Sequence, residues 1–210
     1  MMDVNSTTEN FTRRALWAQI DLDAAAHNMR VIRRHVGPDV RIAAVVKANA
    51  YGHGAVELAR TFAENGADCF AVSSLDEAVE LRRYAGITKN IFILGHTDGR
   101  RTEELLAYHI EPAVFNLKNA EYFSSEASRL GQTLQVHIAI DSGMSRIGFL
   151  PDEESISVIK KISSLPRIEI RGIFTHFAVA DEKDKTFTHE QFRRFMWVCS
   201  CLKDEGIHIP

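Results

Sequence analysis

The sequence is poor in cysteine and proline and has no long apolar run. Its 210 residues include five prolines and three cysteines, Cys69, Cys199 and Cys201, with no CxxC pair. Such a set builds no disulfide framework, so we expect free thiols in a reducing compartment, the cytoplasm. No apolar stretch is long enough to cross a bilayer, and the opening MMDVNSTTENFTRR lacks the apolar core of a signal peptide. We expect no membrane partner.

An excess of one charge sign is missing too. The chain has 25 Lys and Arg against 28 Asp and Glu, a net charge of −3, and no basic cluster interleaved with aromatics. This balance argues against a nucleic-acid partner. There is no GxGxxG after any apolar run, no HExxH or zinc cluster, and no nucleophile elbow. Their absence argues against a dinucleotide-binding domain, a Ser/His/Asp hydrolase and a metal site.

What the chain does contain is a regular alternation of short apolar, β-rich runs with amphipathic helical segments. Hydrophobic residues make up 45% of it, enough to bury a core. The predicted strands are 17–22, 41–48, 69–73, 90–95, 112–116, 134–141 and 168–176. The predicted helices are 23–36, 54–65, 75–85, 100–108, 118–130, 152–163 and 187–204. Asp23 and Ser74 fit helix N-caps, and Gly37 and Gly86 fit helix ends.

Apolar strands that are each followed by a helix predict a parallel sheet covered by helices. The alternatives are a doubly wound sheet and a (β/α)8 TIM-type barrel. Polar and reactive side chains gather where the predicted strands end, as a barrel active site requires, and this favours the barrel. They are Lys47, Ser73, Ser74, His96, Asp141 and His176.

Seven predicted strands do not close an eight-stranded barrel. We therefore expect an incomplete barrel with about six or seven of the strands present. The expected organisation is a polar N-terminal tail over 1–14 and one barrel domain over 15–210, truncated before the last strands.

The most informative segment is AAVVKANAYGHG, residues 43–54. It predicts an apolar strand that carries Lys47 to its C-terminal end, followed by a turn punctuated by Gly52 and Gly54. The apolar neighbours Val45, Val46, Ala48 and Ala50 are expected to leave its ammonium group short of water, which makes the amine a usable nucleophile or base. Such an amine suits Schiff-base chemistry with an aldehyde cofactor. The alternatives are a solvated lysine at a strand end and a Tyr51 that only packs over the turn.

Two further segments place candidate residues at strand ends. In HIAIDSGMSRIG, residues 137–148, Arg146 stands in a tight loop and can hold a phenolate or carboxylate, unless it is a plain surface arginine. In IFTHFA, residues 173–178, His176 stands between aromatics. An imidazole there can lie against an aromatic ring, although a histidine in apolar company is often a core residue.

Together these segments resemble the alanine racemases, which use pyridoxal 5′-phosphate on a (β/α)8 barrel. AVVKANAYGHG resembles the cofactor-binding signature of that family. HIAIDSGMSRIGF and GIFTHFAVAD resemble two later family segments in the same order, and WAQIDLDAAAHNMR resembles its usual opening. The resemblance runs from about residue 17 to the end of the chain. In this family the segment 17–22 tends to belong with a second, β-rich domain.

The resemblance implies a role for each candidate residue. Lys47 would hold the cofactor and act as one of two bases, and Tyr51 would touch the cofactor phosphate. Arg146 would contact the phenolate oxygen of pyridoxal and help to orient the substrate carboxylate, with Met144 beside the substrate. His176 would stack on the ring. The implied activity is the interconversion of L- and D-alanine in a cytoplasmic homodimer that supplies D-alanine to peptidoglycan.

We expect three features that the resemblance implies to be missing from these 210 residues. The family's second base, its phosphate-binding strand and its C-terminal β domain correspond to nothing here. Racemisation needs proton transfer on both faces of Cα, so we expect the 210-residue chain alone to be a poor or inactive racemase. The alternatives are a racemase for serine or another small amino acid, a decarboxylase on the same barrel, and a non-catalytic pyridoxal-phosphate carrier.

A second departure generates a prediction. Many members of the family carry a lysine, often carbamylated, that braces the arginine, and this sequence has Ala139 there. An enclosed cation without an anionic partner is costly. We expect chloride or another anion near Ala139 and Arg146. Crystals soaked in bromide should show an anomalous peak between these residues, and an empty map there contradicts the prediction.

Overall fold

A computed structural model describes residues 16–209. The tail expected over 1–14 lies outside the described residues. The described chain forms one parallel sheet of six strands, in the order β1-β2-β3-β4-β5-β6. Every neighbouring pair is joined by a crossover that contains a helix, as predicted. Within residues 16–209, no helix has the combination of length and apolar character that a membrane span requires.

The strands are short, α2 precedes the first of them, and each strand is followed by at least one helix. The strands are β1 (Ala43–Val45), β2 (Cys69–Val72), β3 (Ile91–Ile93), β4 (Ile110–Val114), β5 (Leu134–Ile140) and β6 (Ile168–Thr175). The α-helices are α2 (Leu22–Val36), α3 (Lys47–Tyr51), α4 (Ala55–Glu64), α5 (Leu75–Glu80), α6 (Thr102–Ala107), α7 (Leu117–Arg129), α8 (Glu153–Ser163) and α9 (Thr186–Asp204). A π-helical turn, Leu81–Ala85, extends α5, and a 3-10 turn, Gly99–Arg101, precedes α6.

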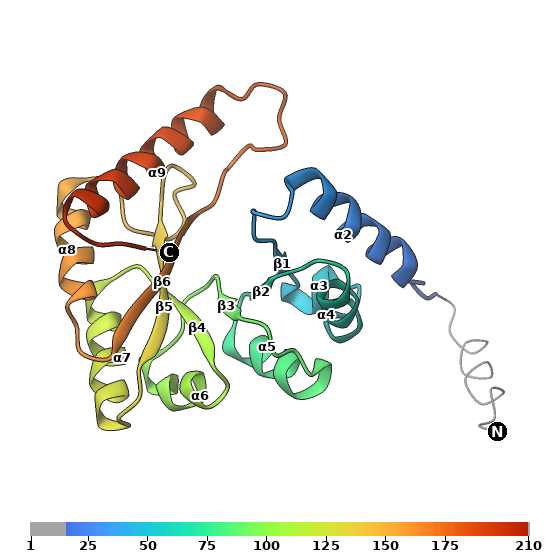
Figure 1. The fold of residues 1–210 in the computed structure, drawn as a ribbon, viewed down its shortest axis with the longest axis horizontal. Coiled ribbons are helices and arrows are strands. Elements are labelled where there is room, and N and C mark those ends of the chain that lie inside the picture. Colours follow the sequence, from blue (N-terminus) through green and yellow to red (C-terminus); the bar gives the residue numbers. More distant parts are fainter. Residues whose placement is uncertain (1–15, 210) are drawn as a thin grey trace.

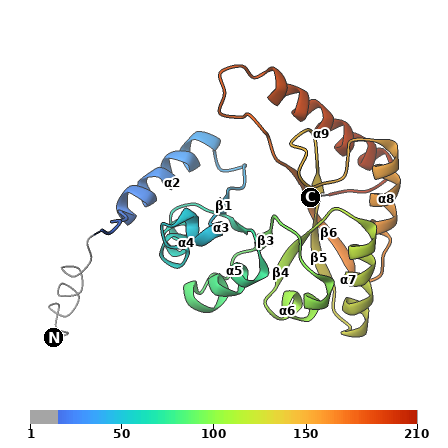
Figure 2. The same cartoon turned by 180° about the vertical axis from the view of Figure 1, so that it is seen from behind.

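The sheet is curved but does not close. In both views the strands follow an arc, with α5, α6, α7 and α8 along its outer side and α2 and α9 at its two ends (Figures 1 and 2). The outermost strands of the sheet are β1 and β6. The prediction of an incomplete (β/α)8-type barrel is therefore confirmed, with six strands in place.

The predicted strand over 17–22 is wrong. Residues 16–21 form no regular element, and helix α2 already begins at Leu22. The reason is local, because the carboxylate of Asp21 accepts a hydrogen bond from Ala24 N–H at 3.0 Å and so caps the helix. Asp23, predicted as the cap, lies in the first turn of the helix. Trp17 stays 58% exposed, without the packing that would hold a strand.

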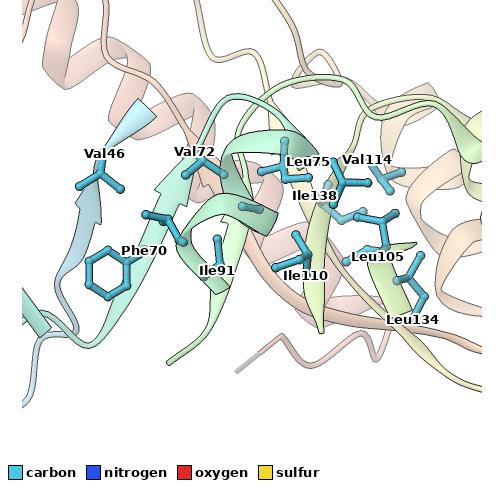
Figure 3. Packing of buried hydrophobic residues seen from close by; sticks show 14 of the residues in the cluster. Val46, Phe70, Val72, Leu75, Ile91, Leu105, Ile110, Val114, Leu134 and Ile138 are labelled. Atoms are coloured by element: carbon cyan, nitrogen blue, oxygen red, sulfur yellow. The ribbon is translucent and has the colours of Figure 1, made fainter. Parts of the chain in front are cut away.

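The core lies between the sheet and its outer helices. Alternate strand residues point outward and pack against apolar helix positions such as Leu75 of α5 and Leu105 of α6 (Figure 3). The strand residues labelled there are Phe70, Val72, Ile91, Ile110, Val114, Leu134 and Ile138, all buried. This packing buries the outward-facing residue at every second strand position.

The concave face of the sheet is polar and aromatic instead. The rings of Phe92 and His137 stack with centroids 4.8 Å apart, and His137 Nε2 donates to Oε2 of Glu111 at 2.5 Å. Between β5 and β6 the register shifts, so that His137 pairs with Gly172 and Arg171 is left over as a bulge. A Cβ on Gly172 would come within 2.5 Å of His137 Nδ1, so glycine makes room for the ring.

Two phenylalanines test where the core lies. Phe70 is fully buried and Phe192 on α9 is 50% exposed. Phe70→Ala should lower the free energy of unfolding by about 3–5 kcal/mol because it leaves a cavity in a packed core. Phe192→Ala should change it by less than about 0.5 kcal/mol. Urea unfolding followed by circular dichroism measures both, and equal losses would contradict this position of the core.

Candidate active site

Every strand-end residue singled out from the sequence lies at the carboxyl rim of the sheet. They are Lys47 after β1, Ser73 and Ser74 after β2, His96 after β3, Asp141 after β5 and His176 after β6. In parallel barrels this rim carries the active site. The local folding of each strand–loop junction therefore decides which side chains can act together.

The segment after Lys47 folds as a left-handed turn. Ala48, Asn49, Ala50 and Tyr51 all have φ between 51° and 57°, and Gly52 follows with φ of 88°. Left-handed helix costs roughly 1–2 kcal/mol per non-glycine residue. Four such residues in a row persist only where surrounding contacts hold them. The sequence predicted a turn with glycines here, but not this conformation.

Several hydrogen bonds hold the turn. The side chain of Asn49 accepts from Ala55 N–H at 2.8 Å and so tethers the turn to the start of α4. Gly54 N–H donates to the carbonyl of Asn49 at 3.0 Å. Ala48 N–H donates to the carboxylate of Glu77, on α5, at 2.7 Å. Sequence reasoning gave Glu77 only a place in a helix-capping segment and did not predict this contact, because Glu77 lies on another element.

Lys47 and Tyr51 lie on the same turn. The ammonium nitrogen of Lys47 stands 5.9 Å from the centroid of the Tyr51 ring. Lys47 is half-buried, while Val45 and Ala48, two of the residues expected to shield it, are exposed. Tyr51 is 61% exposed, so its phenol is available to a ligand.

Arg146 is carried by a loop that one carboxylate organises. Asp141, at the end of β5, is buried and accepts hydrogen bonds from the N–H groups of Gly143 (3.0 Å), Ser145 (2.8 Å) and Arg146 (3.0 Å). Gly148 closes the loop with φ of 131°, and a Cβ there would come within 2.3 Å of Asp141 N. The predicted glycine-rich loop is confirmed, and Met144 lies half-buried within it.

The pKa of His176 responds to the charges of Lys47 and Arg146. Partial burial, followed by the positive charges of Arg146 and Lys47, lowers the pKa of His176 below its ordinary value of 6.5. Lys47 follows β1 and His176 follows β6, the two outermost strands of the sheet. Only the curvature of the sheet brings their charges within reach of each other. The structure therefore groups Lys47, Arg146 and His176 at one rim.

A buried glutamine on α9 supports two of the loops. Gln191 is fully buried, and its Oε1 accepts from Ala178 N–H at 2.9 Å. Its Nε2 donates to the carbonyl of His176 at 3.1 Å and to the hydroxyl of Ser142 at 3.4 Å. Sequence reasoning missed this residue, because nothing in its local pattern separates it from an exposed helix glutamine.

Below the rim, Glu111 and His137 form a second polar group that sequence reasoning missed. Glu111 also accepts from the side chain of Asn90. Burial alone raises the pKa of Glu111, but the hydrogen bonds from His137 and Asn90 outweigh it and hold this pKa below 4.5. The alternation of β4 and β5 could have placed both side chains on one face. Nothing local predicted that they would meet.

The surroundings of Arg146 bear on the predicted anion. Ala139 is buried and pairs in the sheet with Phe174. Arg146 forms no ion pair with any residue in 16–209. Arg146 is exposed rather than enclosed, so the burial cost on which the anion was expected is not met, and an anion at this position stays a prediction. In the same part of the chain, no three His, Cys, Asp or Glu side chains are grouped to hold a metal ion.

Comparison with known proteins gives a consistent result. Residues 20–210 match the family model described as alanine racemase, N-terminal domain. The chain is 52% identical over 197 residues to an alanine racemase of Clostridium perfringens, covering 94% of this chain and 50% of that protein. A structure of Clostridium difficile alanine racemase in complex with cycloserine superposes with a TM-score of 0.89 at 38% identity, covering 94% and 54%. A histidine racemase from Leuconostoc mesenteroides gives a TM-score of 0.77 at 30% identity, covering 83% and 46%.

The fold and the rim thus define a barrel-type α/β domain with a lysine, an arginine and a histidine at its open end. The chain belongs to the alanine racemase family and corresponds to its N-terminal domain. It spans about half the length of the curated relatives it matches.

The pKa of His176 tests this arrangement directly. Removing the positive charge of Arg146 by Arg146→Leu should raise this pKa toward 6.5, because a nearby cation disfavours the imidazolium. NMR titration of the His176 ring protons measures it. Arg34→Leu, on the outer helix α2, is the matched control and should leave the titration unchanged. If the His176 titration is unchanged in Arg146→Leu, the two side chains are too far apart to interact and the proposed grouping is wrong.

Proposed function

We propose that this chain is the cofactor-binding domain of a pyridoxal-phosphate-dependent alanine racemase. The observation that carries the proposal is the position of Lys47, Arg146 and His176 after strands that end at one rim, where Gln191 joins the His176 segment to the loop of Arg146. Membership of the alanine racemase family supports alanine as the substrate. We further propose that the whole protein works as a homodimer in the cytoplasm and supplies D-alanine for peptidoglycan.

The residues at the rim fit pyridoxal phosphate, which is an anion with a flat ring. Lys47 offers a half-buried amine for its aldehyde, and the exposed phenol of Tyr51 on the same turn can donate to its phosphate. Arg146, without an ion-pair partner in the described chain, can hold the phenolate oxygen. His176 with a lowered pKa stays neutral above that pKa and can stack as an uncharged ring.

The chemistry that pyridoxal phosphate supplies when bound is an electron sink, which makes the Cα proton of an amino acid removable. The Lys47 amine takes or returns that proton on one face of Cα. Arg146 orients the substrate carboxylate, and Met144 of the same loop lies beside the substrate. Asp141 keeps this loop in place through its bonds to three backbone amides.

This chain by itself should be a poor racemase. We assign one base among the described residues, Lys47, and inversion requires proton transfer on the opposite face as well. The related proteins of known length are about twice as long. We therefore expect this chain alone to catalyse proton exchange on one face of Cα, without inversion.

Two alternative functions are each favoured by one observation: a racemase for another amino acid and a non-catalytic carrier of pyridoxal phosphate. Similarity to a histidine racemase favours a relative that accepts another amino acid. The assignment of a single base favours a domain that binds pyridoxal phosphate without turnover. Both keep Lys47 as the attachment point, so attachment is tested first and substrate second.

The chain should attach pyridoxal phosphate at Lys47. After incubation with the cofactor and reduction with borohydride, peptide mass spectrometry should find the pyridoxyl group on Lys47. Lys47→Arg should abolish the labelling, and Lys118→Arg, an exposed lysine on α7, should leave it intact. With alanine in deuterated water, the loaded chain should exchange the Cα proton and invert little.

Each part of the proposal has its own contradicting result. Labelling spread over surface lysines, or absent from Lys47, rules out cofactor binding at this rim. Labelling without Cα exchange favours the carrier, and faster exchange with serine or histidine than with alanine favours another substrate. Turnover equal to that of full-length racemases would contradict the one-base argument.

A further inference from the structure

We propose that Glu77 is the positioning residue for the segment from Lys47 to Tyr51: its carboxylate fixes the left-handed turn and thereby sets where the lysine amine and the tyrosine phenol stand. That these two groups serve a cofactor rests on the proposed function. That Glu77 holds the turn rests on the contacts alone.

Glu77 joins the ends of two neighbouring strands. Its Oε1 accepts from Ala48 N–H at 2.7 Å, directly after Lys47. Its Oε2 accepts from both the N–H and the hydroxyl of Ser73, at 2.7 and 2.8 Å, directly after β2. One carboxylate therefore bridges the β1 and β2 junctions, and it forms no ion pair with any side chain in 16–209.

The start of helix α5 holds Glu77 in position. Ser74 is the N-cap of this helix, and its hydroxyl accepts from Glu77 N–H at 3.4 Å. Glu77 thus stands in the first helical turn, where the helix dipole favours a negative charge. Burial raises the pKa of Glu77, but the hydrogen bonds from Ser73, Ala48 and Ser74 outweigh it and bring this pKa below 4.5. The carboxylate is ionised at neutral pH and accepts strongly.

The turn needs this support because its conformation is unfavourable for its own residues. Ala48, Asn49, Ala50 and Tyr51 lack the freedom of glycine at positive φ. Ala48 is the first residue of the left-handed stretch, and its N–H is the group that Glu77 binds. The hydrogen bond from Ala48 to Glu77 thus lies where the backbone changes from negative φ to the left-handed conformation. The direction of the side chains of Lys47 and Tyr51 depends on that reversal.

The test compares Glu77→Gln with Glu80→Gln in the 210-residue chain without cofactor. Glutamine keeps the size of the side chain but loses the charge and one acceptor oxygen. Glu80 lies on the same helix and makes no hydrogen bond or ion pair through its side chain in the described residues, so it is the matched control. Hydrogen exchange of the Ala48 and Ser73 amides should be about tenfold faster or more in Glu77→Gln, and unchanged in Glu80→Gln.

A second measurement separates positioning from general stability. Labelling of Lys47 by pyridoxal phosphate, trapped with borohydride, should slow by about tenfold in Glu77→Gln. Adding Ala48→Gly should restore much of this rate, because glycine adopts positive φ without strain and the exposed Ala48 side chain packs against nothing essential. Exchange of the Val136 and Ile138 amides in β5 reports on the fold as a whole.

Three results overturn the proposal. They are unchanged exchange of Ala48 in Glu77→Gln, loss of protection in β5 together with Ala48, and a double variant that labels as slowly as Glu77→Gln. If the wild-type chain never labels at Lys47, the proposed function fails. The exchange of Ala48 relative to β5 still decides whether Glu77 holds the turn.

Discussion

Two carboxylates at the rim, Asp141 and Glu77, bind backbone amides rather than cations, and the geometry of the site depends on this. Asp141 accepts from three N–H groups of the loop that carries Arg146, and Glu77 accepts from the backbone on both sides of the β1–β2 junction. Lys47 and Arg146 form no ion pairs within residues 16–209. The negative charges shape the loops, and the positive charges stay available to an anionic ligand.

Much of the site follows from sequence because it depends on where strands end. Lys47, Asp141 and His176 each follow an apolar run, and parallel strands end at one rim. The glycines around Arg146 likewise identified a tight loop. The segment 17–22 misled the prediction because its apolar alternation suits a strand, while Asp21 caps a helix that starts one residue later. A short capping contact outweighed a weak pattern.

The remaining features depend on contacts between distant parts of the chain. Ala48 to Tyr51 have no intrinsic preference for left-handed backbone, and the partner that stabilises it, Glu77, belongs to the next βα unit. The bond between Glu111 and His137 joins two strands whose register only the folded sheet sets. Local propensity carries no information about such pairs, so the sequence predicted the position of the site better than its internal geometry.

Gln191 connects helix α9 to two segments of the candidate site. Its side-chain amide forms hydrogen bonds with the main chain of His176 and Ala178 and with the hydroxyl of Ser142. It therefore joins the loops that follow β5 and β6. A shift of α9 relative to the sheet would therefore displace the main chain at His176 and the start of the loop that carries Arg146 together. The placement of α9 and the geometry of the rim are thus linked through the single side chain of Gln191.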